Sequence, residues 1–245
     1  MNDLIKIENL YKNYHTPSGE INALSNINLN IQKGEIIGIV GPSGCGKSTL
    51  LNILSELEKP TSGSIKKDTN NIAYMLQSDA LLPWLNVLDN CLLGLKITKK
   101  LNKENINYVK KLISKFDLDN FINKYPNSLS GGMKQRVALI RTLALKPDII
   151  LLDEPLSALD YVTRLTITDE IYKVVKELKI TTILISHDIS ECVSFCDKVV
   201  VLSKRPGTIK NIYPIELINP SIPSNNRKDE KFNYNYDLIW SDLDK

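Results

Sequence analysis

The sequence has only four cysteines and no long hydrophobic run. So few cysteines in 245 residues do not make a disulfide framework, and we expect free thiols in a reducing compartment. The spacing of His187, Cys192 and Cys196 matches no zinc motif, so both cysteines are expected to be buried small side chains. The longest apolar segments, 36–40 and 149–152, fall far short of the roughly 18 residues that a membrane-spanning helix needs. Any role at a membrane is therefore expected to be peripheral.

An excess of one charge is also missing. There are 31 Lys and Arg residues against 28 Asp and Glu residues, which gives a net charge of +3. Proteins that bind a phosphate backbone usually carry a larger basic excess, so nucleic acid is not expected as a partner. Residues 1–6 lack the charged-then-apolar order of a secretory signal, which predicts a cytosolic chain. The content of 42% hydrophobic and 24% charged residues is typical of a soluble globular protein.

The sequence alternates between β-like and helical segments, which predicts an α/β fold with a mostly parallel core sheet. Short β runs at 4–7 and 24–31 predict an antiparallel layer at the N-terminus. The apolar run 35–40 resembles a buried parallel strand and leads into a helix expected from residue 47 to about 57. Further helices are expected at 130–145 and 162–178, and further strands at 149–152, 182–185 and 199–202, with a last β run after 207.

A change of composition marks an insert in this pattern. From about residue 84 to 125, Leu, Ile and Val recur among Lys and Asn without a strand signal, so this region is predicted to be helical. With the helix that follows, the helical insert extends over about 84–145. We expect one domain over 1–220 and a short tail over 221–245, in which a helix at about 237–243 packs its aromatic residues on the domain.

Residues 41–49 match the P-loop pattern and lie between a predicted strand and a predicted helix. In such a loop, backbone N–H groups and the helix N-terminus bind phosphate groups. Lys47 is expected to reach the β- and γ-phosphates of ATP, and Ser48 to offer its hydroxyl to Mg²⁺. The alternative is a glycine-rich turn without a ligand. The expected nucleotide-binding residues of this segment are Gly41, Pro42, Ser43, Gly44, Cys45, Gly46, Lys47, Ser48 and Thr49.

Two carboxylates directly follow the apolar run 149–152. The end of a parallel strand is where ligands bind in such sheets, so Asp153 is predicted to hold Mg²⁺ and Glu154 to activate the attacking water. Taken alone, such a pair is more often only a solvated turn. A P-loop in the same chain favours the catalytic interpretation.

The segment 129–136, LSGGMKQR, resembles the signature motif of the nucleotide-binding subunits of ATP-binding cassette transporters. The resemblance covers about residues 4–215 and implies an ATPase that uses Mg²⁺. It also implies roles for other residues, which occur in the order typical of the family. Tyr14 stacks on adenine, and Gln77 contacts Mg²⁺ and ATP. Asp160, the last residue of the D-loop, lies near the nucleotide, and His187 contacts the γ-phosphate. Tyr11 is an alternative to Tyr14 for the stacking role.

The resemblance further implies a dimer. In this family the signature of one subunit, here Ser130 and Gly132, closes over the ATP bound to the P-loop of a second copy, which gives two composite sites. It also implies permease subunits in the membrane as partners and an extracytoplasmic substrate-binding protein as an indirect one. The expected location is the cytoplasmic face of the cell membrane.

Three segments resemble the branch that serves nitrate, sulfonate and taurine importers, namely 77–84, 153–164 and 201–207. Importers of vitamin precursors belong to the same branch. Leu81, Leu82, Pro83 and Trp84 are predicted to form an exposed apolar patch that receives the permease, and the alternative is that Trp84 belongs to the core.

Two other functions would leave different sequence features. A soluble ATPase of the same family that acts on DNA or ribosomes would predict a long coiled coil or a second cassette, and neither is seen. A small-molecule kinase would not carry the signature. The sequence therefore favours the energy-coupling subunit of an importer.

Overall fold

The computed structural model describes residues 3–17 and 19–243. Its centre is a six-stranded sheet with the order β5-β6-β7-β3-β8-β9. Only β9 runs antiparallel to its neighbour. The strands are β3 (Ile36–Val40), β5 (Ile72–Met75), β6 (Ile149–Asp153), β7 (Thr181–Ile185), β8 (Lys198–Leu202) and β9 (Ile209–Pro214).

The central strands are apolar on both faces because both faces of the sheet are covered. Every residue of β3, β6 and β7 is buried, as expected for parallel strands flanked by helices. Parallel pairing brings the carboxyl ends of β5, β6, β7 and β3 to the same edge of the sheet. That edge is where the predicted catalytic residues lie.

The predicted antiparallel layer is confirmed and contains three strands, in the order β2-β1-β4. They are β1 (Asp3–Thr16), β2 (Gly19–Gln32) and β4 (Ser62–Lys67). Helix α1 (Lys47–Leu54) packs its buried leucines in the same core as the inward side chains of β1 and β2 and one face of β3. The start of α1 is therefore held between the two sheets.

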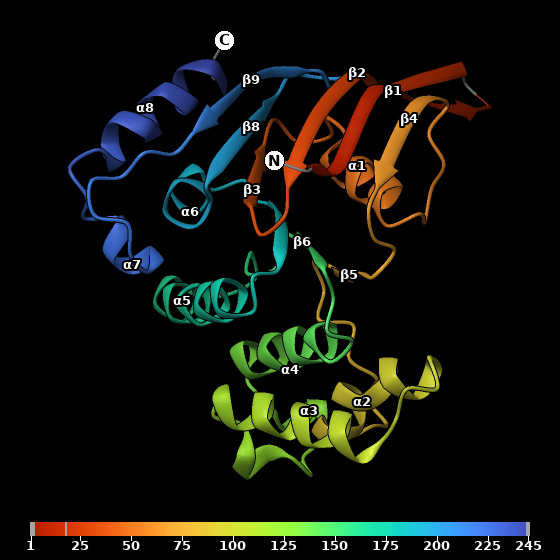
Figure 1. Cartoon of the computed structure of the whole chain (residues 1–245), viewed down its shortest axis with the longest axis vertical. Coiled ribbons are helices and arrows are strands. Elements are labelled where there is room, and N and C mark those ends of the chain that lie inside the picture. Colours follow the sequence, from red (N-terminus) through yellow and green to blue (C-terminus); the bar gives the residue numbers. More distant parts are fainter. Residues whose placement is uncertain (1–2, 18, 244–245) are drawn as a thin grey trace.

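The predicted insert forms three helices, α2 (Val87–Ile97), α3 (Lys103–Lys115) and α4 (Gly131–Leu143), with 3₁₀ turns η1 (Asp119–Phe121) and η2 (Pro126–Ser128). Figure 1 shows these helices grouped at the end of the molecule away from β1, β2 and β4. The side chains of Asn86, Asn102 and Ser130 each accept a backbone N–H of the following turn, which satisfies one free donor of each helix. The remaining core helices are α5 (Tyr161–Leu178) and α6 (Ile189–Phe195).

The C-terminal tail is more helical than predicted. It contains α7 (Pro223–Asn226) and α8 (Phe232–Leu243), so the last helix begins well before residue 237. Its aromatic residues are only partly packed: Phe232 is buried, whereas Tyr234 is 64% exposed and Trp240 is 52% exposed. The domain boundary at residue 220 stays a prediction.

Other differences concern short elements. The first helix ends at Leu54 because Glu56 adopts a left-handed backbone, with φ 65°. The sequence does not predict β4 and β5, because one is a mostly exposed edge strand and the other has only four residues. None of the helices in the described part of the chain is long and apolar enough to cross a membrane.

Candidate active site

The P-loop encloses one side of a cavity of about 790 Å³. The loop follows β3 and turns into α1 through Gly44 and Gly46, which have φ values of 73° and 105°. A side chain at Gly46 would also lie 2.7 Å from Leu24 Cδ2, so glycine is required there by backbone conformation and by space. The cavity is lined by Tyr14, His15, Thr16, Ile21, Ala23, Gly41, Ser43, Gly44, Gly46, Lys47, Ser48, Thr49, Glu154, His187 and Arg205.

Lys47 begins α1 and lines this cavity. Its Nζ donates to the carbonyl oxygens of Gly41 at 2.8 Å and Pro42 at 3.1 Å. The side chain is mostly buried, and in this conformation the loop carbonyls replace the water that burial removes. A phosphate in the cavity would offer a stronger, charged acceptor in their place.

The carboxylate of Asp153 is close to the P-loop helix. Ser48 Oγ donates to Asp153 Oδ1 at 3.3 Å, and the hydroxyl of Tyr74 donates to Oδ2 at 3.0 Å. Burial, together with the carboxylate of Asp153, raises the pKa of Tyr74, so its hydroxyl stays a donor. Hydroxyl and carboxylate oxygens are the ligands that Mg²⁺ prefers, and Mg²⁺ usually binds few protein groups besides phosphate. This donor set fits the predicted ion.

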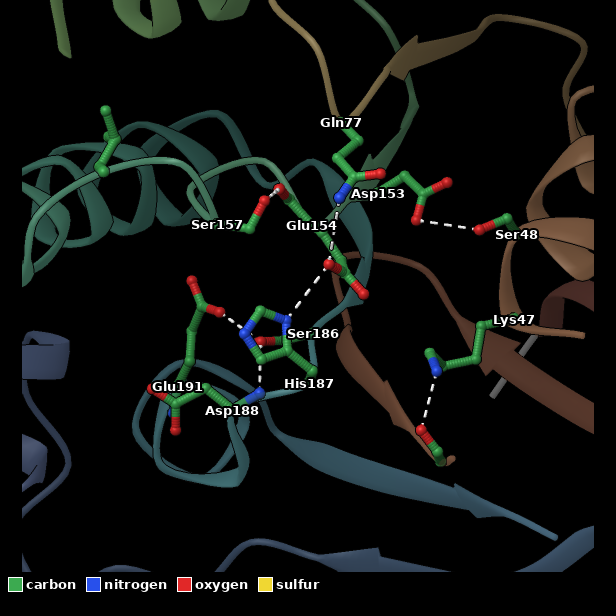
Figure 2. Close-up of polar contacts among 12 residues, drawn as sticks. Lys47, Ser48, Gln77, Asp153, Glu154, Ser157, Ser186, His187, Asp188 and Glu191 are labelled. Atoms are coloured by element: carbon green, nitrogen blue, oxygen red, sulfur yellow. Dashed lines mark hydrogen bonds and ion pairs between the residues drawn. The ribbon is translucent and has the colours of Figure 1, made fainter. Parts of the chain in front are cut away.

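Two side chains converge on the carboxylate of Glu154. Figure 2 shows Gln77, in the loop after β5, and His187, in the loop after β7, both directed at it. Gln77 Nε2 donates to Glu154 Oε2 at 3.4 Å, and His187 Nδ1 lies 3.2 Å from the same oxygen. Residues from three separate strand ends thus meet beside Lys47 and Ser48, as the sequence predicts for this edge of the sheet.

The backbone at Glu154 is strained. Its φ is 46°, a left-handed value that an L-residue rarely adopts. Two contacts hold it: Glu154 N donates to Ile185 O at 3.0 Å, and Ser157 Oγ donates to Glu154 O at 3.1 Å. Strain of this kind is often found at catalytic residues, where the surrounding structure stabilises it.

Tyr14 lines the cavity and Tyr11 does not. The hydroxyl of Tyr14 donates to Glu58 Oε2 at 2.6 Å, and Lys12 Nζ lies 4.7 Å from the ring centroid. Burial and the bond to Glu58 raise the pKa of Tyr14. Tyr11 pairs with Ser62 in the antiparallel sheet. Of the two tyrosines, only Tyr14 is placed to meet a ligand in the cavity.

Six predicted nucleotide-binding residues of the described chain are not part of the cavity lining. Pro42 and Cys45 lie in the P-loop and Gln77 contacts Glu154, whereas the other three lie elsewhere. Among the residues that the structure describes, the cavity lining includes neither Ser130 and Gly132 nor Asp160. Ser130 caps α4, its Oγ accepting Met133 N at 3.3 Å, and Asp160 caps α5 through Thr163 N. Within one chain, the signature segment and the P-loop therefore do not form one site.

The predicted apolar patch is smaller than expected. Trp84 is 69% exposed and Pro83 is exposed, which contradicts the alternative that Trp84 belongs to the core. Leu81 and Leu82 are half-buried, and Leu81 packs against the helical core. Asn90 fixes this segment, because its side chain accepts Leu82 N and donates to Leu82 O.

Sequence reasoning misses several residues of the site. The cavity lining that it does not predict consists of His15, Thr16, Ile21, Ala23 and Arg205, and it also misses Tyr74 beside Asp153. Tyr74 contacts Asp153 only because β5 pairs with β6, and no sequence motif marks that pairing. Arg205 lies in the turn after β8 and lines the cavity. The one sequence signal for its segment is the resemblance to the importer branch, which assigns Arg205 no role at the site.

The family model described as ABC transporter matches residues 24–157. Several curated relatives are similar over most of the chain. The aliphatic sulfonates import ATP-binding protein SsuB 2 of Pseudomonas syringae pv. tomato is 41% identical over 80% of this chain and 83% of its own length. The nitrate transport protein NasD of Klebsiella oxytoca is 36% identical over 90% of this chain and 88% of its own length. The taurine import ATP-binding protein TauB of Pelagibacter ubique is 38% identical, covering 94% and 90%.

Solved structures with the same fold include MJ0796, described as a bacterial ABC transporter cassette. Its dimeric structure superposes with a TM-score of 0.77 at 35% identity and covers 86% of this chain and 99% of MJ0796. A post-hydrolysis dimer of MJ0796 with ADP and Pi superposes with a TM-score of 0.76 at 34% identity, with the same coverage.

Proposed function

The chain belongs to the family of ABC transporter ATP-binding proteins and is an ATPase, and we propose that it drives the uptake of a small solute through a separate permease. The observation that carries the hydrolytic part of this proposal is the convergence of Gln77 and His187 on Glu154 at the P-loop cavity, and the import and transport proteins among the relatives support uptake. A cavity that only bound a nucleotide would not need a carboxylate held in this way.

We assign the residues of the site different roles in ATP hydrolysis. Lys47 and the N–H groups of the P-loop bind the phosphates of ATP, and they stabilise the charge that develops on the transferred group. Glu154 accepts a proton from the attacking water. His187 and Gln77 orient that carboxylate and contact the terminal phosphate.

A magnesium ion completes this site in our proposal. Ser48, Asp153 and Gln77 would hold it, directly or through water. When bound, Mg²⁺ neutralises charge on the β- and γ-phosphates.

We also propose that two copies of the chain form two composite sites. Ser130 and Gly132 lie at the N-terminus of α4, where free N–H groups can bind an anion. Because they do not reach the cavity of their own chain, they would complete the cavity of a second copy. Asp160, which caps α5, would lie at the same interface. The dimeric structures of MJ0796 support a dimer of this chain.

Tyr14 is proposed to stack on adenine, and Tyr14→Ala is expected to lower ATP affinity. Loss of a stacked aromatic ring from a base costs about 1 to 3 kcal/mol. Isothermal titration calorimetry with ATP would measure the change. Tyr14→Phe, which keeps the ring, should bind ATP nearly as the wild type does. Tyr11→Ala is the matched control, and a loss of affinity in that variant alone would assign the stacking role to Tyr11.

The proposed solute is a small molecule of the nitrate, sulfonate or taurine type, or a vitamin precursor. The import and transport proteins among the relatives support this class. The chain would act at the cytoplasmic face of the membrane, bound to permease subunits that receive solute from an extracytoplasmic binding protein. A DNA- or ribosome-linked ATPase of the same family is the competing function.

Trp84→Ala is expected to weaken assembly with the permease and to abolish solute-stimulated ATP hydrolysis. Trp84 is exposed beside the loop of Gln77, and an aromatic anchor at an interface often contributes about 2 kcal/mol or more. Basal ATP hydrolysis should change little, because Trp84 does not line the cavity. Co-purification with the permease and ATPase assays in proteoliposomes would measure both effects.

The second tryptophan provides the control. Trp240 on α8 is 52% exposed, so Trp240→Ala removes a comparable exposed ring elsewhere on the surface. We expect it to leave permease assembly unchanged. Normal assembly in the Trp84 variant would contradict the proposed docking surface, and wild-type stimulation by ribosomes or DNA in place of the permease would favour the competing function.

A further inference from the structure

The turn between β8 and β9 contributes Arg205 to the cavity wall and is closed by internal hydrogen bonds. Ser203 N donates to Thr208 O at 2.9 Å, and Thr208 N donates to Ser203 Oγ at 2.9 Å. The same hydroxyl can donate to the carbonyl groups of Lys204 and Pro206, at 2.9 Å and 3.1 Å. These bonds close the turn around its own polar groups, so the backbone that carries Arg205 is held at both ends.

The turn is also fixed to the rest of the site. Gly207 N donates to Ala23 O and Ser25 N donates to Gly207 O, each at 2.9 Å, which ties the turn to β2. A Cβ on Gly207 would lie 2.1 Å from Cys45 O, so the backbone of the turn touches the P-loop itself. Glycine is required at this position by the close approach. Arg205 is thus carried on a turn that is bonded to β2 and packed against the P-loop.

Arg205 differs from Lys47, the lysine of the cavity, in having no hydrogen-bond or ion-pair partner among the residues that the structure describes. Lys47 donates to two loop carbonyls. The guanidinium of Arg205, by contrast, is exposed, lines the cavity and makes no hydrogen bond or ion pair within residues 3–17 and 19–243. The planar guanidinium group has five N–H donors whose geometry suits phosphate oxygens, and it can also stack on an aromatic base. A cation left unpaired in a cavity built for a polyanion points to the ligand as its partner.

The attachments of the turn indicate which end of the cavity Arg205 faces. Its support is bonded to β2 at Ala23 and Ser25, on the side of the cavity formed by β1 and β2, where Tyr14 lies. Glu154 and His187, which mark the γ-phosphate end, follow β6 and β7. We propose that Arg205 binds the nucleotide at the nucleoside and α-phosphate part that ATP and ADP share. This inference rests on the proposed nucleotide site.

A contact with the shared part of the nucleotide has a specific consequence. Removing the contact should weaken the binding of ATP and the binding of ADP by the same factor, because the γ-phosphate is not involved. It should also raise KM while leaving kcat unchanged, since the contact is equally strong in the ground state and the transition state. A charge-assisted contact of this kind corresponds to a change of roughly tenfold or more in affinity.

The test compares Arg205→Met with Lys204→Met in the full-length chain. Lys204 is the adjacent cation, is exposed, and lines a separate small cavity with Lys210 and Asp242. Calorimetric titration with unlabelled ATP and ADP would give the affinities, and phosphate release would give KM and kcat. We expect Arg205→Met to bind both nucleotides with roughly tenfold lower affinity. The affinities of Lys204→Met should match those of the wild type. Arg205→Lys keeps the positive charge but not the planar guanidinium, so its loss of affinity should be smaller.

Three results would overturn the inference. Affinities of Arg205→Met that equal those of Lys204→Met and the wild type would show that Arg205 does not bind the nucleotide. A loss for ATP alone, with a fall in kcat, would place Arg205 at the γ-phosphate. A wild-type chain that binds neither nucleotide would overturn the proposed site itself, and the inference with it.

Discussion

Replacing Glu154 with glutamine is expected to abolish ATP hydrolysis while ATP binding is retained. Glutamine has the shape of glutamate but cannot accept the proton of the attacking water, and loss of a general base lowers the rate by about 10²–10⁴-fold. The proposed P-loop contacts with ATP do not involve this side chain, and Lys47 is bonded to the loop carbonyls and not to Glu154. The variant should therefore accumulate as an ATP-bound dimer. Phosphate release, ATP affinity and size-exclusion chromatography with ATP would measure the three effects.

Lys47→Ala is the control for this experiment, because it removes a cation that binds the nucleotide. That variant should lose ATP affinity itself and should not form the ATP-dependent dimer. Hydrolysis at the wild-type rate by Glu154→Gln would contradict the assignment of Glu154. In that case another group at this edge of the sheet would act as the general base. His187, which contacts Glu154 directly, is one such group.

Mixing two inactive variants is expected to restore activity. Lys47→Ala damages both P-loop sites of a dimer, and Ser130→Arg damages both signature sites. In a mixed dimer, the intact P-loop of one chain faces the intact signature of the other, so one composite site is complete and the second carries both defects. Hydrolysis and ATP-dependent association should therefore recover in the mixture while each homodimer stays inactive.

The structure explains why this complementation requires two chains. Ser130 caps α4 in the helical insert, and Figure 1 shows that helix apart from α1, where Lys47 lies. Exchange of chains can be verified by co-purification of differently tagged variants. If exchange occurs and no activity returns, the signature does not act on the nucleotide of the partner chain. If a Ser130→Arg homodimer is fully active, Ser130 has no role at the site.

Much of the catalytic edge could be predicted from local sequence. Residues 41–49 specify their own turn, because Gly44 and Gly46 readily adopt the left-handed backbone that the loop needs. Glu154 follows a strand that is buried on both faces, and such a strand belongs inside a parallel sheet. Parallel strands then deliver their carboxyl ends to one edge, which places the following carboxylates near the P-loop.

Which tyrosine faces the cavity could not be read from the sequence. In a regular strand, Tyr11 and Tyr14 would lie on opposite faces, since side chains alternate. Strand β1 has register shifts between Leu10 and Lys12 and between Lys12 and Asn13, and each shift breaks the alternation. Pairing with β2 and β4 therefore decides the outcome, and it places Tyr14 at the cavity.

By itself, the sequence determined the fold class, the P-loop, the carboxylates after β6 and the order of the motifs, because each depends on a short segment with its own backbone and burial pattern. Only the tertiary structure decided the rest. Tyr74 meets Asp153 through the pairing of β5 with β6, and Arg205 enters the cavity because Gly207 is fixed to β2 and the P-loop. These contacts join residues far apart in the chain, and the physical reason is that strand pairing and close backbone approach are properties of the folded molecule, which no single segment encodes.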